Sequence, residues 1–159
     1  MTRDHLPLVA GLISTTLLAG AFFFQYVLGL VPCGLCLTQR WLHAGALLAT
    51  FLALALPSAV SRAIGLLAAS GAAAGGFFHA GVELQFWDGP QACSDTGEDL
   101  ATMSGQDLLS FDAPAHIVKC TEIAWEFAGI SMAGWNGLIS LCAVLIWIIV
   151  LFRPGKSYS

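Results

Sequence analysis

Apolar residues in this chain gather into four long blocks, which are separated by polar or proline-containing segments. The blocks run over about residues 6–30, 41–56, 63–82 and 133–152. A membrane-spanning helix needs roughly 20 apolar residues. The first, third and fourth blocks have this length, and the second reaches it when extended back to Leu37, over 37–56. The pattern predicts an all-α membrane protein, a bundle of four transmembrane helices.

Composition agrees with a membrane protein, because 57% of the residues are hydrophobic and only 10% are charged. Soluble domains carry about 25% charged residues. The first block begins after Arg3, as a signal peptide would, but its apolar run continues to Leu30. The apolar part of a cleaved signal is about 7–15 residues long. We therefore expect an uncleaved first helix and one membrane domain over residues 1–159.

Two connections then lie on the same side of the membrane, over about 31–36 and 83–132. The second connection is long, and four of its apolar residues predict a short interfacial helix. These residues are Leu100, Met103, Leu108 and Leu109.

Basic residues give the orientation. Four of the six lie on the other side of the membrane, namely Arg3, Arg62, Arg153 and Lys156. By the positive-inside rule both termini are cytoplasmic, and both connections are periplasmic. The net charge of −4 argues against nucleic acid as a partner.

Cysteines provide the candidate chemistry, since four of the five fall in the two periplasmic loops, at Cys33, Cys36, Cys93 and Cys120. Disulfides persist in that oxidising compartment. The Cys33-Gly-Leu-Cys36 spacing brings two thiols close enough to share a disulfide. The fifth cysteine, Cys142, lies inside the last helix, where we expect a small buried hydrophobic residue.

Arg40 follows Cys36 by one helical turn, and positions 33, 36 and 40 fall on one helix face. A neighbouring cation is the usual way to favour a thiolate. A cysteine pair beside a cation at the membrane edge indicates electron transfer between thiols and a molecule dissolved in the lipid.

These residues resemble a known family. Pro32–Trp41, with the sequence PCGLCLTQRW, resembles the first outer loop of DsbB, the quinone-linked disulfide-forming membrane protein. Cys93 and Cys120 fit its second outer loop. Residues 122–132 resemble its re-entry into the fourth helix, so the resemblance covers nearly the whole chain.

The resemblance implies a membrane thiol oxidoreductase of the bacterial inner membrane. Such an enzyme reoxidises a DsbA-like periplasmic thioredoxin-fold protein by disulfide exchange and passes the electrons to a membrane quinone, ubiquinone or menaquinone. Cys36 would contact the quinone and Cys33 would exchange with Cys120. Cys93 would form the mixed disulfide with the partner, and Arg40 would stabilise the thiolate and the reduced quinone. The implied resting disulfides are Cys33–Cys36 and Cys93–Cys120.

His79 and Glu83 are one turn apart near the outer end of the third helix. Ionisable groups within a membrane span are functional candidates by default, and the family has a histidine near this position at its quinone site. We therefore add His79 and Glu83 to Cys36 and Arg40 as candidate cofactor-binding residues. A histidine that is simply hydrogen-bonded between helices is the alternative.

Three other functions stay open. His43 and His79 could be axial ligands of a haem-binding electron carrier, although this leaves the outer cysteines unexplained. The four outer thiols could form a soft-metal site, whereas the DsbB resemblance implies no metal. In a vitamin K epoxide reductase-like protein, the loop cysteines would precede the C-x-x-C pair, but here they follow it.

Overall fold

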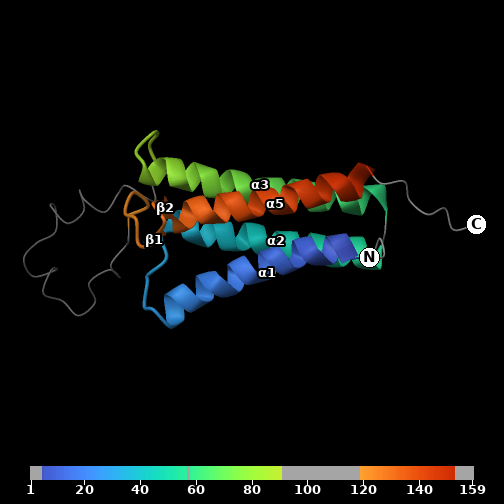
Figure 1. The fold of residues 1–159 in the computed structure, drawn as a ribbon, viewed down its shortest axis with the longest axis horizontal. Helices are drawn as coiled ribbons and strands as arrows, with labels where there is room; N and C mark the ends of the chain where they lie inside the picture. The colour runs from blue at the N-terminus through green and yellow to red at the C-terminus, as the bar shows by residue number, and fades with distance from the viewer. Residues whose placement is uncertain (1–4, 57, 91–118, 153–159) are drawn as a thin grey trace, which may run out of the picture.

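Four helices run side by side along most of the molecule (Figure 1). The computed structural model describes residues 5–56, 58–90 and 119–152. Helices α1 and α2 are followed by α3 and, after the long connection, by a short antiparallel hairpin of β1 and β2 and then α5. Their bounds are α1 His5–Tyr26, α2 Gly34–Ala55, α3 Ala59–Glu83, β1 Glu126–Phe127, β2 Ile130–Ser131 and α5 Met132–Phe152.

Three of these helices, α1, α3 and α5, are long and apolar enough to cross a membrane. Helix α2 has 22 residues, like α1, but carries Gln39, Arg40 and His43 in its first half. Large apolar side chains are exposed on the outer faces of all four helices. The structure therefore confirms a mainly helical membrane-type fold. The β1–β2 hairpin was not predicted, and the predicted interfacial helix lies outside the described residues.

The first connection differs from the predicted one at both ends. Helix α1 ends at Tyr26, not near Leu30, and Gly29 follows with a φ of 71°. Helix α2 begins at Gly34, so Cys36 lies in its first turn and not in a loop. Cys33 is the N-cap, and its sulfur accepts a hydrogen bond from the backbone N–H of Cys36. This capping bond is the local reason why α2 starts before its apolar block.

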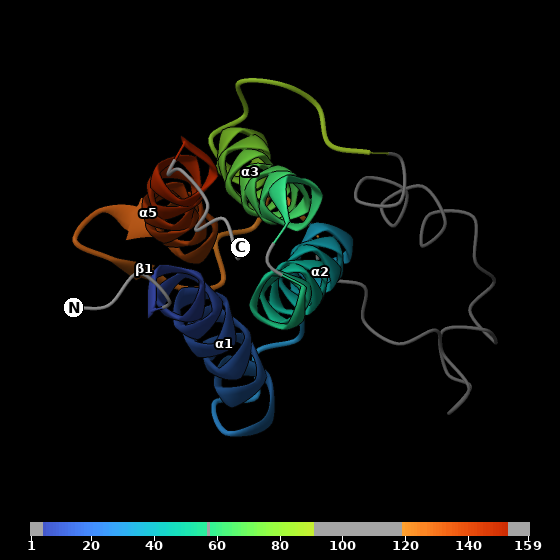
Figure 2. The same ribbon diagram turned by 90° about the vertical axis from the view of Figure 1, so that its right-hand side faces the viewer.

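Several glycines mark close approaches between helices, and at Gly76 of α3 an added Cβ would lie 2.5 Å from the backbone of Gly137 of α5. A Cβ added at Gly11 of α1 would lie 2.7 Å from Thr50 of α2. At Gly65 of α3 it would lie 2.5 Å from the ring of Trp147, which is only 1% exposed. Glycine allows these close approaches between helices. Helix α1 then diverges from the bundle toward its Tyr26 end (Figures 1 and 2).

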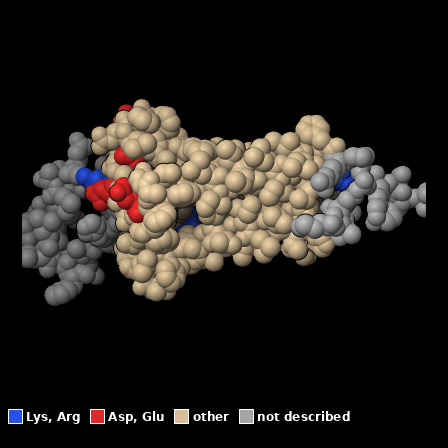
Figure 3. Space-filling model, viewed as in Figure 1, with Lys and Arg blue, Asp and Glu red and all other residues tan. Residues whose placement is uncertain are grey.

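Described charged residues gather at the end where the hairpin lies, and the middle of the bundle is almost free of them (Figure 3). We call this end the hairpin end and the opposite one the Trp147 end. The described charged residues after α2, apart from Arg62 near the start of α3, are Glu83, Asp88, Lys119, Glu122 and Glu126.

Candidate functional site

The Cys33 and Cys36 sulfurs lie together at the start of α2. Cys33 Sγ donates a hydrogen bond to Cys36 Sγ over 2.9 Å, and both residues are free thiols. The hydrogen bond to Cys36, together with burial, raises the pKa of the Cys33 thiol well above its usual range. One turn of helix thus lets the pair share a proton. The disulfide expected between them in the resting protein stays a prediction.

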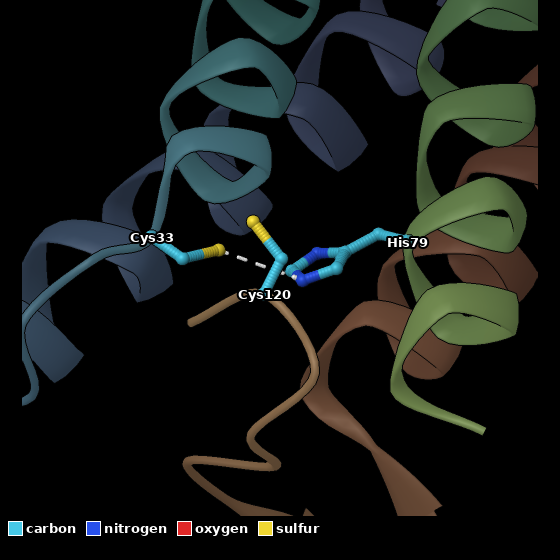
Figure 4. A group of neighbouring side chains, drawn as sticks. All are labelled: Cys33, His79 and Cys120. Carbon is cyan, nitrogen blue, oxygen red and sulfur yellow. Dashed lines mark hydrogen bonds between the residues drawn. The ribbon is translucent and has the colours of Figure 1, made fainter. Parts of the chain in front are cut away.

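Cys120 reaches this pair from the segment before β1 (Figure 4). Its side chain is fully buried and is already part of a disulfide. The sulfurs of Cys33 and Cys120 and a ring nitrogen of His79 all lie within 4.8 Å of one another. His79 Nε2 is 3.5 Å from Cys33 Sγ. The fold therefore places a cysteine of the long connection beside the C-x-x-C pair. Cys93 lies outside the described residues.

A chain of buried polar side chains continues from His79 into the bundle. Gln39 Nε2 donates to His79 Nδ1 over 2.7 Å, and Gln39 Oε1 accepts from Asn136 Nδ2. Asn136 Oδ1 accepts from His43 Nε2 over 2.7 Å and from Ser140 Oγ over 3.4 Å. We call these five residues the buried polar network. It connects α2, α3 and α5 at the hairpin end.

Sequence reasoning missed Gln39, Asn136 and Ser140. Gln39 and Asn136 bond to each other although they are 97 positions apart in the sequence, and Ser140 bonds to Asn136 one turn away on α5. Polar residues within a span usually face other helices, so Asn136 in the largely apolar α5 is the signal that could have found the network.

Glu83 stands between His79 and the hairpin. Its Oε1 is 3.9 Å from His79 Nε2, and its Oε2 accepts a hydrogen bond from the Ser131 hydroxyl. Ser131 belongs to β2, so the hairpin positions the Glu83 carboxylate. The predicted proximity of His79 and Glu83 is thus observed, and both face Cys33 and Cys120 rather than lipid.

The Arg40 side chain reaches across to α1. Its guanidinium donates to the Gln25 side chain and, over 3.1 Å, to the backbone carbonyl of Ala21. It also lies 5.0 Å from the centre of the Phe22 ring. Its Nε is buried and has no hydrogen-bond partner among the described residues. Arg40 therefore links the diverging α1 to α2 and keeps one donor unused.

A cavity of about 430 Å³ opens between the helices at this end. Binding sites for small molecules typically range over about 300–1,000 Å³. Its walls come from all four helices and from the segments that carry Cys33 and Trp125. The polar or ionisable side chains on its walls include Cys36, Arg40, His43, His79 and Glu83. All four predicted cofactor-binding residues therefore line one cavity, which the thiol pair borders.

Comparison with known proteins identifies the family. The family model for the disulfide bond formation protein DsbB matches residues 3–150. A disulfide bond formation protein B of Polaromonas sp. is 32% identical over 99% of this chain and 95% of its own length. Its namesake in Marinobacter nauticus is 31% identical, over 89% of this chain and 88% of its own. The disulfide bond formation protein B of Pseudoalteromonas translucida is 34% identical, over 84% of this chain and 80% of its own length.

This chain belongs to the DsbB family. It is therefore a membrane disulfide oxidoreductase whose family role is to reoxidise DsbA in a quinone-dependent reaction. The DsbB resemblance of the sequence is confirmed over nearly the whole chain.

The soft-metal and haem alternatives both fit this DsbB-family site poorly. A cysteine binds a metal ion as a thiolate, but the Cys120 sulfur is held in a disulfide. The rings of His43 and His79 are connected through Asn136 and Gln39, and these side chains occupy the space that a haem between them would need.

Cys142 is not the buried residue that was expected. Its side chain is exposed on α5, and its thiol is free. The residue faces outward because the inner face of α5 is taken by smaller or polar residues such as Ser140 and Ala143. Its Sγ lies 3.7 Å from the Leu138 carbonyl of its own helix.

Proposed function

We propose that this DsbB-family enzyme reoxidises a DsbA-like thioredoxin-fold protein in the periplasm and passes the electrons to a membrane quinone through two cysteine pairs. The observation that carries the proposal is the position of Cys120. Its buried sulfur lies beside Cys33, while Cys36, the partner of Cys33, borders the cavity. Two redox pairs must come within bonding range to exchange, and this arrangement supports such a relay.

In the proposed order, a thiolate of the partner attacks the Cys93–Cys120 disulfide at Cys93, and the bond to Cys120 breaks. The released Cys120 thiolate attacks Cys33 in an oxidised Cys33–Cys36 pair. The new Cys33–Cys120 bond forms, and the electron pair of the broken bond stays on Cys36. The role of Cys93 rests on the family resemblance alone.

The cavity is proposed as the quinone site, with Cys36, Arg40, His79 and Glu83 as its polar residues. The group fits, because the cavity holds a small molecule and Arg40 Nε offers a buried donor that no described residue uses. A donor left unpaired in such surroundings is unfavourable, so a carbonyl oxygen is a suitable partner. When bound, the quinone supplies an acceptor for two electrons and two protons. Ubiquinone and menaquinone share this chemistry.

We further propose the bacterial inner membrane as the location, with both termini cytoplasmic and the hairpin end periplasmic. The basic residues near the two termini and at Arg62 support this orientation. It exposes the cysteine loops to the compartment in which disulfides are made.

The test is quinone reduction by the purified protein in detergent, followed as absorbance loss with a reduced DsbA-like protein as the electron source. We expect Cys36→Ser to lower the rate by about a thousandfold or more, as removal of a nucleophile does in other enzymes. Cys142→Ser is the matched control, because it replaces an exposed thiol that does not line the cavity. It should keep the wild-type rate. Quinone-dependent turnover that persists in Cys36→Ser would overturn the assignment.

A further inference from the structure

His79 is the residue of the site whose role the thiol relay leaves open. Its ring is buried, with 3% of the residue exposed, and lies between Gln39 and the sulfur of Cys33. The two ring nitrogens face different partners, so the position of the ring proton decides what His79 does.

The buried polar network determines that position. Ser140 and His43 both donate to Asn136 Oδ1, which turns the amide nitrogen of Asn136 toward Gln39 Oε1. Gln39 must then present its own amide nitrogen to His79 Nδ1. Because Nδ1 accepts this hydrogen bond, a neutral His79 carries its proton on Nε2.

The His79 ring hydrogen-bonds to the backbone of Cys120, and two side-chain acceptors also lie near its Nε2–H group. Cys33 Sγ lies at 3.5 Å and the nearer oxygen of Glu83 at 3.9 Å. The Glu83 carboxylate already accepts a hydrogen bond from Ser131. Within this geometry the sulfur is the closer acceptor, and it also receives the backbone N–H of Cys36 over 3.3 Å. Two donors are therefore directed at one sulfur.

We propose that His79 is a catalytic hydrogen-bond donor that stabilises Cys33 as the leaving thiolate when the Cys33–Cys120 disulfide is resolved, and that Gln39 positions it. The inference rests on the proposed relay. In this step a thiolate attacks Cys120 Sγ, the Cys33–Cys120 bond breaks, and the electron pair of that bond stays on Cys33. The structure has the bonding pattern that follows this step, with Cys120 in its own disulfide and Cys33 free.

Assistance is needed because Cys33 is otherwise a poor leaving group. A thiol with a high pKa leaves slowly in disulfide exchange, and the contact with Cys36 raises the pKa of Cys33. A hydrogen bond to a charged atom is worth more than one to a neutral atom. The Nε2–H donor therefore favours the thiolate over the thiol and over the mixed disulfide.

The test measures the competition between two disulfides directly. In a Cys36→Ser background, Cys120 can be linked either to Cys33 or to the cysteine of its own disulfide. After equilibration in mildly alkaline buffer, acid quenching and non-reducing peptide mapping give the ratio of the two linked forms. We expect His79→Leu to raise the share of the Cys33–Cys120 form about tenfold, because a hydrogen bond to a charged sulfur is lost.

Companion variants separate a donor from a merely structural residue. His79→Gln retains an N–H group in place of Nε2 and should restore most of the wild-type ratio. In Gln39→Leu, no amide holds the His79 ring proton on Nε2. This variant should shift the ratio in the same direction as His79→Leu, by a smaller factor. Cys142→Ser, which replaces an exposed thiol outside the buried polar network, should leave it unchanged.

A wild-type ratio in His79→Leu, or an equal shift in His79→Leu and His79→Gln, would overturn the proposal. The assay uses neither quinone nor a partner protein. A failure here is therefore distinct from a failure of the proposed function, which would show as absent quinone reduction in the wild-type protein.

Discussion

The hairpin end and the Trp147 end of the bundle are held together by different interactions. At the Trp147 end, small residues bring the helices into direct contact around one large ring, and the cluster contains Ala10, Ala53, Ala69, Ala143 and Trp147. At the hairpin end, α3 and α5 still touch at Gly76 and Gly137, but α1 diverges, and hydrogen bonds of the buried polar network connect α2, α3 and α5 beside a cavity. Apolar packing alone holds the Trp147 end, whereas polar contacts and a cavity are added at the hairpin end.

This difference has a physical basis. In lipid there is no hydrophobic force between apolar helices, so close packing and interhelical hydrogen bonds determine association. Close packing fills space, which suits the Trp147 end. Hydrogen bonds are directional and tolerate an intervening space, and they therefore allow four helices to surround a cavity without losing their register.

Substitution of Arg40 should have the largest effect at the hairpin end, because Arg40 connects α1 to α2 beside the cavity. We expect Arg40→Ala to lower kcat/KM for the quinone by about a hundredfold, the effect of losing one preorganised charged donor. The thermal unfolding midpoint should change little. Arg40→Lys should recover only part of the rate, because lysine has a single charged nitrogen and no planar fork. Wild-type rates in Arg40→Ala at all quinone concentrations would contradict the assignment.

Gly65 tests the Trp147 end. A Cβ at this position would meet the Trp147 ring at 2.5 Å, and a buried indole has little room to move. We expect Gly65→Val to lower the free energy of unfolding by about 2 kcal/mol through overpacking. Quinone reduction per folded molecule should remain at the wild-type level, since Gly65 does not line the cavity.

Gly45 is the matched control for Gly65, because a Cβ there would have no neighbour within 4 Å. Gly45→Ala should keep or slightly raise the unfolding midpoint, since alanine favours helix. Equal losses of stability in Gly45→Ala and Gly65→Val would show that packing against Trp147 is not the cause.

Asn136 gives the smallest expected effect and tests the hydrogen-bonded end. Asn136→Leu removes the bonds to Gln39 and His43. Because hydrogen bonds between membrane helices are individually weak, we expect a loss of about 1 kcal/mol in the free energy of unfolding in detergent. A loss as large as that of Gly65→Val would indicate that the two ends are not held by different means.

The helices and the family were predictable from the sequence, because long apolar blocks and the Cys33-Gly-Leu-Cys36 motif are local signals. The start of α2 was placed at Leu37 and not at Gly34, because the Cys33-Gly-Leu-Cys36 segment was assigned to the first loop. The structure directs Gln39 into the bundle and Arg40 toward α1. The direction of a side chain depends on its tertiary partners, and one sequence does not contain that information.

Dependence on tertiary partners also explains the remaining differences between the predicted and the observed site. Cys33 and Cys120 could be paired only through the family resemblance, because no local pattern connects residues so distant in the chain. The network of Gln39, Asn136 and Ser140 depends on three helices having the same depth in the bundle. Cys142 was assigned to the core by residue type, whereas helix rotation decides which face it occupies.

The N-cap of α2 has a mechanical consequence. The sulfur that caps the helix by accepting the Cys36 N–H is also the sulfur that we propose to exchange with Cys120. Whenever Cys33 is bonded to another sulfur, its charge density falls and the cap weakens, so the first turn of α2 frays more easily. In the proposed relay, each catalytic cycle would thus loosen and tighten one helical turn. Amide hydrogen exchange at Cys36 would follow this movement as a direct record of the redox state.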